Sequence, residues 1–147
     1  MMDVELPIKL LSEDIRVPSY AHSGDAGMDL RSAVDVTLQP FERKLIPTGI
    51  SLAIPPGFAG FVQPRSGMAI KYGLSLVNTP GLIDSAYRGE IKIPAINLDS
   101  TTEINIHAGD RIAQLVILPF ASATPVIVED LDETVRADGG FGSTGEQ

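Results

Sequence analysis

Short runs of Val, Ile and Leu, separated by prolines and glycines, constrain more than any other feature what this chain can fold into. Apolar segments of strand length occur at 34–36, 50–54, 60–62, 74–77 and 104–106. The 11 prolines interrupt every longer helical pattern and mark turns or strand edges. Many short strands joined by turns predict an all-β sandwich or barrel.

Two longer apolar segments and one short helix complete the expected fold. Residues 91–98 alternate at first between apolar and polar positions, and residues 111–119 are almost continuously apolar, as in a strand buried on both faces. Either the interior of the sandwich or a neighbouring subunit could cover that second strand. The helix is expected from Ser66 to Tyr72, with Ser66 as its N-cap and Gly73 ending it.

The charge balance narrows the classes of partner. The chain has 19 acidic against 11 basic residues, a net charge of −8, so we expect no broad basic surface for nucleic acid. A small anion can still bind where a few arginines or backbone amides converge. Cysteine is absent, which excludes disulfides, thiolate nucleophiles and Cys-ligated zinc. Binding of a hard cation such as Mg²⁺ by carboxylates and substrate phosphates remains possible.

Location and domain organisation follow from the two ends of the chain. Residues 1–11 lack the basic start and long apolar run of a signal peptide, and no apolar stretch reaches membrane-spanning length. We therefore expect a cytoplasmic protein without a membrane partner. One β domain is expected at residues 1–128, followed by a C-terminal arm at 129–147.

The arm is acidic at first and then glycine-rich, without any strand or helix period. It could be a disordered terminus, as is common for such tails. It could instead be a mobile lid, in which Arg136 supplies charge, Phe141 a stacking face, and Ser143, Thr144 and glycine amides the donors for a phosphate.

Polar chemistry is concentrated in three expected loops, at 26–30, 64–68 and 81–90. Arg65, Ser66 and Gly67 offer a guanidinium, a hydroxyl and free N–H groups, which suit a phosphate, although a helix start with a surface arginine fits as well. Gln114 could point its amide at a phosphate or a water. A structural role is favoured over a functional one for the adjacent Asp110 and Arg111, and Arg111 could form a structural ion pair.

Four further side chains each have two interpretations. Asp84 could be the general base that deprotonates a water, or a turn aspartate bonded to its own backbone. Tyr87 could pack flat against a sugar and exclude a 2′-hydroxyl, or fill the core. Asp29 could orient a hydrated Mg²⁺, or end a turn. Lys92 could reach the pocket of Asp84, or belong to an ordinary strand surface.

These segments, taken together and in this order, resemble the five motifs of the homotrimeric dUTPases. The matching segments are 26–30, 64–68, 78–90, 109–115 and 136–145. Any one could occur by chance, whereas five in order are highly specific. The resemblance implies a jelly-roll β fold and a homotrimer whose three active sites each draw on all three subunits. It also implies Mg²⁺-assisted hydrolysis of dUTP to dUMP and pyrophosphate, which keeps uracil out of DNA and supplies dUMP for thymidylate synthesis.

The resemblance also implies a role for each matching residue. Asp84 would activate the attacking water, and Asp29 would hold Mg²⁺ through water. The phosphate chain would be bound by Arg65, Ser66, Gly67 and Gln114, and its end covered by Arg136, Gly142, Ser143 and Thr144 of the arm. Phe141 would stack on uracil. The loop with Asn78, Gly81, Leu82 and Ile83 would read uracil, mostly through backbone hydrogen bonds, and Tyr87 would exclude ribose. Lys92 matches a position that often contacts the substrate. Ala137 stands where the family usually has glycine, which bears on the flexibility of the arm.

Two other functions remain to be separated from this one. A dCTP deaminase, possessing dUTPase activity or not, shares the fold but lacks the closing pattern at 136–145. A non-catalytic trimeric interaction protein would keep the fold without the activity, and the joint presence of Asp84, Arg65, Gln114 and Phe141 argues against it.

Overall fold

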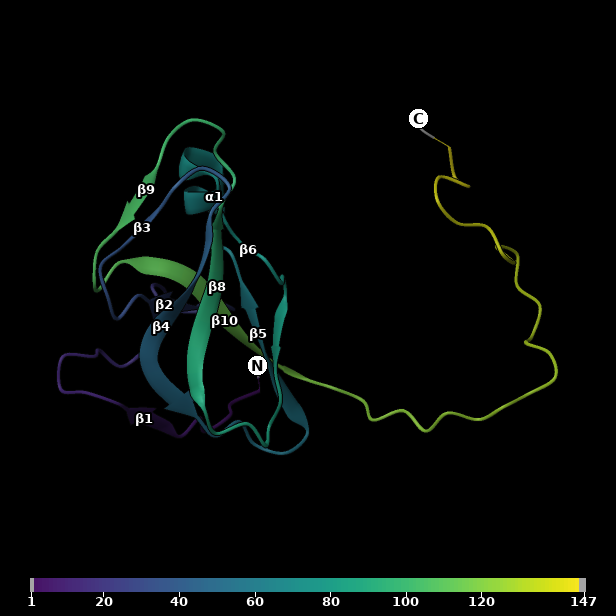
Figure 1. Cartoon of the computed structure of the whole chain (residues 1–147). Helices are drawn as coiled ribbons and strands as arrows, with labels where there is room; N and C mark the ends of the chain where they lie inside the picture. The colour runs from purple at the N-terminus through teal and green to yellow at the C-terminus, as the bar shows by residue number, and fades with distance from the viewer. Residues whose placement is uncertain (1, 146–147) are drawn as a thin grey trace.

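The computed structural model describes residues 2–145, in which short antiparallel strands and one helix form the body. The elements are β1 (Ile8–Leu10), β2 (Met28–Arg31), β3 (Val36–Leu38), β4 (Arg43–Leu52), β5 (Phe58–Gln63), α1 (Ser66–Tyr72), β6 (Leu74–Leu76), β7 (Gly81–Ile83), β8 (Glu90–Asn97), β9 (Ile104–Ile106) and β10 (Arg111–Pro119). The expected all-β fold with one short helix is confirmed (Figure 1).

Two four-stranded sheets and one two-stranded pair build the sandwich. The strand orders are β1-β4-β8-β6, β2-β10-β5-β7 and β3-β9. Apolar side chains from all three meet in one core, as Ile93 of β8, Leu115 of β10 and Ile104 of β9 illustrate. Each such buried side chain contributes about 1.5–3 kcal/mol of transfer free energy. The core thus fixes the mutual position of the strands that carry the polar residues.

Asn97, the last residue of β8, is a polar residue whose side chain is fully buried in the core. Its Nδ2 donates to the carbonyl oxygens of Leu38 (3.0 Å) and Thr102 (2.9 Å), and its Oδ1 accepts the N–H of Asp99 at 2.8 Å. The N–H of Thr101, and next that of Thr102, hold the pKa of the Asp99 carboxyl below its usual value. This network ties the end of β3 to the loop after β8.

The covering of β10 changes along the strand. Ile112, Ala113 and Leu115 are buried in the core of the sandwich. The first half of β10 is therefore covered by the chain itself and needs no neighbouring subunit. Leu118, nearer the end, is 44% exposed. The second half of β10 therefore leaves apolar surface free in the single chain.

Two of the expected loops are wrong in part. Met28–Arg31 form β2, and Gly81–Ile83 form β7. Each is a strand because a longer neighbour pairs with it: β10 places Gln114 opposite Asp29, and β5 places Val62 opposite Gly81. Asp29 consequently projects from a strand instead of a loop.

The helix has the expected bounds, but its expected cap is wrong. Arg65, in an extended conformation, is the N-cap, and its side chain makes no capping hydrogen bond. Gly73 ends the helix in the left-handed region (φ +73°), as expected. Two of the prolines expected at strand edges lie inside strands: Pro47 in β4, where the pairing with β8 shifts register, and Pro94 in β8.

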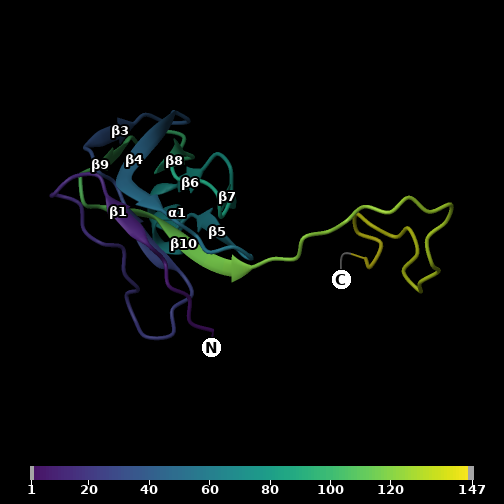
Figure 2. The ribbon, with the colours of Figure 1, turned by 90° about the horizontal axis from the view of Figure 1, so that it is seen from below.

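The chain leaves the body after β10, and its C-terminal part extends away from the sheets in both views (Figures 1 and 2). Phe120 donates its N–H to Gly57, whereas the described hydrogen bonds of residues 121–145 all lie within that segment. Val126, Ile127 and Leu131 are largely or fully exposed. Residues 146 and 147 of the expected arm lie outside the described residues. No helix among the described residues is long and apolar enough to cross a membrane.

Candidate functional site

A first cavity, of about 460 Å³, lies beside β7 and the start of β8, and we call it the base cavity. It brings together Asp84, the expected general base, with residues of the body that the sequence assigned to the substrate: Asn78, Gly81, Leu82, Ile83, Tyr87 and Lys92. Apolar side chains of Val62, Leu76 and Ile91 line it as well. A cavity with an apolar wall and a few polar groups is typical of small-molecule sites.

The turn from β7 to β8 places Asp84 and Tyr87 on the wall of the base cavity. β7 is held by its pairing with β5, in which Ile83 lies opposite Gly60. Within the turn, Tyr87 donates its N–H to the carbonyl oxygen of Asp84 at 3.1 Å, and Arg88 donates from Nη1 to the carbonyl oxygen of Ser85 at 2.6 Å. The turn is thus closed by main-chain acceptors.

The base cavity contains two carboxylates in different situations. Glu90 accepts the N–H of Gly49 on Oε2 at 3.0 Å, so it is bound to β4. The Asp84 carboxylate is exposed, and no hydrogen bond or ion pair to it is found among the described residues. Asp84 accepts the N–H of Tyr87 with its carbonyl group, so its side chain is not the backbone-bonded group of an ordinary turn aspartate. Its carboxylate can therefore accept a proton from a water.

A second cavity, of about 420 Å³, lies where β2, β10 and the start of α1 meet, and we call it the phosphate cavity. It brings together the residues of the body, though not those of the arm, that the sequence assigned to the phosphates and the metal: Asp29, Arg65, Ser66, Gly67 and Gln114. Asp25, which the sequence analysis missed, lines it too.

An ion-pair network centres on Asp29, whose side chain is only 16% exposed. Its Oδ1 lies 3.0 Å from Nε of Arg65, and its Oδ2 lies 3.4 Å from Nη1 of Arg111. The structural ion pair expected of Arg111 is thus present, with Asp29 as its partner, while the adjacent Asp110 accepts the N–H of His107 at 2.8 Å. Adjacent side chains of an extended chain point to opposite sides, so Arg111 is free to face β2.

Gln114 braces the loop that begins α1. Its Nε2 donates to the carbonyl oxygen of Pro64 at 2.9 Å, directly before Arg65. Gly27 leaves room for this side chain, since a Cβ at position 27 would overlap the Oε1 of Gln114. Gln114 thus lies in the phosphate cavity as expected, with one amide hydrogen already engaged by the protein.

The two cavities lie at different places on one sheet. In β5, Ile83 of β7 faces Gly60, whereas Gln114 of β10 faces Gln63. These rows are about 10 Å apart along the strand, and β7 and β10 flank β5 on opposite sides, which adds about 10 Å across the sheet. The chain therefore does not bring Asp84 and Arg65 together.

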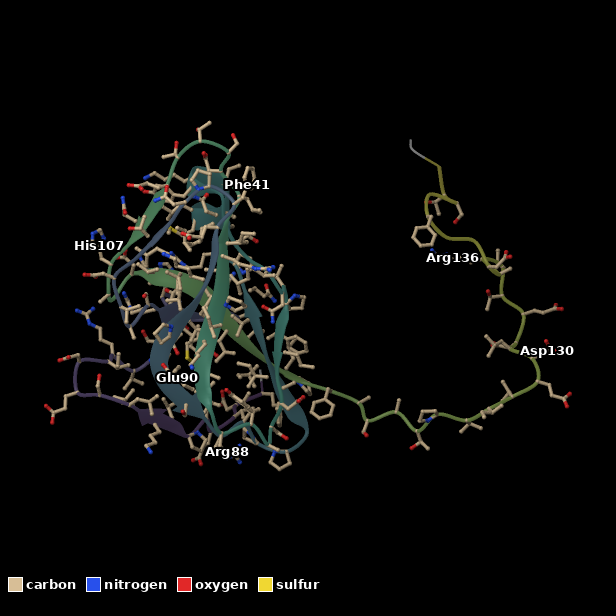
Figure 3. All side chains as sticks on the ribbon, in the orientation of Figure 1. Phe41, Arg88, Glu90, His107, Asp130 and Arg136 are labelled. Carbon is tan, nitrogen blue, oxygen red and sulfur yellow. The ribbon has the colours of Figure 1, made fainter. Side chains whose placement is uncertain are left out.

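The arm residues also lie apart from both cavities. Arg136 donates from Nε to Gly139 within the arm at 2.8 Å, and Phe141 is fully exposed. Figure 3 shows Arg136 on the distant arm, while Arg88 and Glu90 lie on the body. Gly142, Ser143 and Thr144 lie in the same segment. Ala137, at the position where the family usually has glycine, adopts a left-handed φ of +48°.

Comparison with known proteins identifies the family of this chain. The sequence model of the family described as dUTPase matches residues 13–145. The chain belongs to the dUTPase family. It is 51% identical to the deoxyuridine 5'-triphosphate nucleotidohydrolase of Thermobifida fusca, over 97% of this chain and 79% of that protein. It is 52% identical to the enzyme of the same name from Mycolicibacterium gilvum, over 98% of this chain and 97% of that protein.

Solved structures of dUTPases share the fold. A dUTPase mutant of Staphylococcus bacteriophage 80alpha with dUpNHpp has a TM-score of 0.90 and 32% identity, over 96% of this chain and 98% of that chain. A mutant of the phage phi11 dUTPase, described as showing the coordination of a structural Mg(II) ion, has a TM-score of 0.82 and 31% identity, over 88% and 100% of the two chains. The family predicted from the sequence is confirmed, whereas the role of each site residue stays a prediction.

Proposed function

We propose that this chain hydrolyses dUTP to dUMP and pyrophosphate, by attack of a water on the α-phosphorus with Asp84 as the base. The observation that carries the proposal is the free carboxylate of Asp84 on the wall of the base cavity. A water held beside it can lose a proton to the carboxylate as it attacks. No covalent intermediate is needed, because alignment of the water and neutralisation of charge suffice. The reaction lowers dUTP and supplies dUMP.

The base cavity would select uracil and deoxyribose. Gly81 and Ile83 are buried in β7, so their main chain is held rigidly against β5, next to Asn78. Fixed main-chain donors and acceptors read one base edge and leave no room for an added methyl group. Tyr87 would meet the sugar with its ring, and Lys92 would contribute a positive charge to the same wall.

The phosphate cavity would bind the triphosphate. Arg65 offers a guanidinium, and Ser66 and Gly67 offer a hydroxyl and main-chain N–H groups where α1 begins. Gln114 fixes that loop and would use its second amide hydrogen for a phosphate oxygen. The arm would close over the end of the phosphate chain with Arg136, Gly142, Ser143 and Thr144, and stack Phe141 on the base.

The carboxylates of the phosphate cavity fit a hydrated Mg²⁺. Among the described residues there is no group of three or more His, Cys, Asp or Glu side chains that could hold a metal ion. The protein alone therefore does not provide a complete set of metal ligands. Asp29 and Asp25 offer few carboxylate oxygens beside a phosphate site, and Mg²⁺ takes few protein ligands and keeps its waters. Asp29 would hold the ion through water. When bound, Mg²⁺ neutralises charge on the phosphates.

A homotrimer with shared sites would unite the two cavities. Within one chain Ile83 and Gln114 are about 14 Å apart, because they are displaced by about 10 Å along the strands and by about 10 Å across the sheet. A nucleotide that touches Asp84 with its α-phosphate cannot also place the next phosphates on Arg65 of the same chain. A base cavity from one subunit and a phosphate cavity from the next would meet this need, with the exposed end of β10 as apolar surface for the contact.

Pyrophosphate release from dUTP, dCTP, dTTP and UTP, with Mg²⁺ or with a chelator, tests the activity. We expect release from dUTP alone, reduced by the chelator. Asp84→Asn should keep the affinity for dUpNHpp and lose most of kcat. Ammonia from dCTP would identify a deaminase, and tight binding of dUpNHpp without turnover of dUTP would identify a non-catalytic protein.

Mixed trimers test the sharing of sites. Asp84→Asn and Arg65→Ala subunits should each be inactive alone. After unfolding and refolding together in equal amounts, about a quarter of the sites would combine an intact Asp84 with an intact Arg65 from another subunit. Recovery of that share of activity supports shared sites, and no recovery contradicts them. The cytoplasmic location stays a prediction.

A further inference from the structure

The ring of Tyr87 lies against Gly89, two residues further along the same turn. A Cβ placed on Gly89 would lie 2.6 Å from Cζ and 3.0 Å from Cε2 of Tyr87, and would overlap its Oη. Contacts this short do not persist, so any side chain at position 89 would displace the ring. Gly89 is not among the residues with a positive φ. Its backbone therefore accepts an alanine, and the contact with Tyr87 is what requires glycine here.

The phenol group fixes the other end of the ring. Oη of Tyr87 donates to the carbonyl oxygen of Glu90 at 2.9 Å. Glu90 is in turn anchored to β4, because its carboxylate accepts the N–H of Gly49. Gly49 lies where the pairing of β4 with β8 shifts register between Pro47 and Ser51, so the carboxylate supplies an acceptor at a break in the ladder. The ring of Tyr87 is thus held by a chain of contacts that ends in the sheet.

We propose that Gly89 is a positioning residue that sets how strictly the site excludes ribonucleotides. Without a side chain at 89, the ring of Tyr87 rests on the main chain of the turn, with Oη on Glu90. In this position the ring forms part of the wall of the base cavity. The inference rests on the proposed function, in which Tyr87 meets the sugar. If the ring of Tyr87 is displaced from this position, it no longer fills the space that a 2′-hydroxyl would occupy.

The test uses the full-length protein and the variant Gly89→Ala, with kcat and KM measured for dUTP and UTP. We expect the ratio of kcat/KM for dUTP to that for UTP to fall at least about tenfold, with the change for dUTP mainly in KM. Tyr87→Phe keeps the ring but loses the bond to Glu90, and should lower the ratio less. Ala86→Ser adds one atom to the same turn at an exposed position and should leave the ratio unchanged.

A double-mutant cycle separates positioning from general damage. If Gly89 acts through Tyr87, adding Gly89→Ala to Tyr87→Ala should change the ratio no further, because the ring that it seats is gone. A turn that is merely destabilised would lower kcat/KM for both substrates in parallel, and the ratio would stay. An unchanged ratio in Gly89→Ala, or a further fall in the double variant, overturns the inference.

The same data distinguish this inference from the proposed function. If the parent protein releases no pyrophosphate from dUTP, the proposed function fails. If the parent is specific for dUTP and Gly89→Ala keeps that specificity, only the role of Gly89 fails. Urea unfolding of each variant, at one protein concentration, shows whether the compared proteins are folded.

Discussion

Replacing Asp29 by asparagine should have opposite effects on nucleotide binding without metal and on turnover with Mg²⁺. In the free protein the carboxylate is paired with Arg65 at 3.0 Å and with Arg111 at 3.4 Å. A phosphate that approaches Arg65 must therefore compete with a carboxylate, and also meets its negative charge. Asparagine has nearly the same volume and keeps one acceptor oxygen, so packing changes little.

The size of the effect follows from the ion-pair geometry. A phosphate oxygen on the far side of the Arg65 guanidinium would lie about 6 Å from the carboxylate, since each contact with the guanidinium spans about 3 Å. At effective dielectric constants of about 80 to 40, one unit charge at that distance contributes about 0.7 to 1.4 kcal/mol. Metal-free binding should therefore tighten about 3- to 10-fold.

Calorimetric titration with dUpNHpp, in the presence of a chelator, measures this gain, which should shrink as salt is added. Pyrophosphate release from dUTP with Mg²⁺ should instead fall at least about tenfold, since residues that hold a metal through water cost about 10- to 100-fold when removed. Asp110→Asn, outside the phosphate cavity, is the control and should change neither quantity. Weaker metal-free binding by a folded Asp29→Asn protein would refute the reasoning.

Three further predictions concern stability and the arm. Phe41 is 62% exposed at a left-handed φ of +61°, so Phe41→Gly should raise the free energy of unfolding by about 1 kcal/mol, and an unchanged or lower urea midpoint would contradict this. Asn97→Ala leaves one buried and two partly buried hydrogen-bonding groups without their partner and should cost about 2–3 kcal/mol, whereas the exposed Asn105→Ala should cost less than about 1 kcal/mol. Equal losses of unfolding free energy in the two asparagine variants would contradict the claim that burial of Asn97 sets the size of the effect. Deleting residues 129–147 should leave the mass in light scattering that of a trimer while kcat/KM for dUTP falls by about 100-fold or more, and dissociation would mean that the arm is structural.

The parts of the fold that the sequence predicts are those encoded locally. The strand at Ile104–Ile106 and the helix at Ser66–Tyr72 have the expected bounds, because an apolar alternation or a terminating glycine lies within a few residues. β2 and β7 have only four and three residues and little apolar period of their own. They are strands because β10 and β5 offer free edges, which only the folded sheet contains.

The candidate site also combines features that the local sequence predicts with features that depend on the folded sheet. The resemblance of the five motifs predicted many of the residues that line the two cavities, whereas it gave no sign of Asp25 or of the apolar wall formed by Val62, Leu76 and Ile91. The partners of Asp29 could not be predicted, because Arg111 is 82 residues away and reaches it only through the pairing of β2 with β10. The sequence predicted an ion pair for Arg111 but not which carboxylate would form it. Gly89 gave no signal either, since a glycine in a turn is ordinary until the position of the Tyr87 ring is known.

The strand order of the second sheet gives a physical reason why a single chain would be an incomplete enzyme. β5 contributes Val62 to the base cavity and leads directly into Arg65 of the phosphate cavity. It is paired on both sides, with β7 and β10, so neither cavity can move toward the other without loss of ladder hydrogen bonds. Closure of one chain therefore cannot unite Asp84 with Arg65, whereas association of rigid subunits can. If that is so, activity should depend on protein concentration at high dilution while the secondary structure of the chain persists.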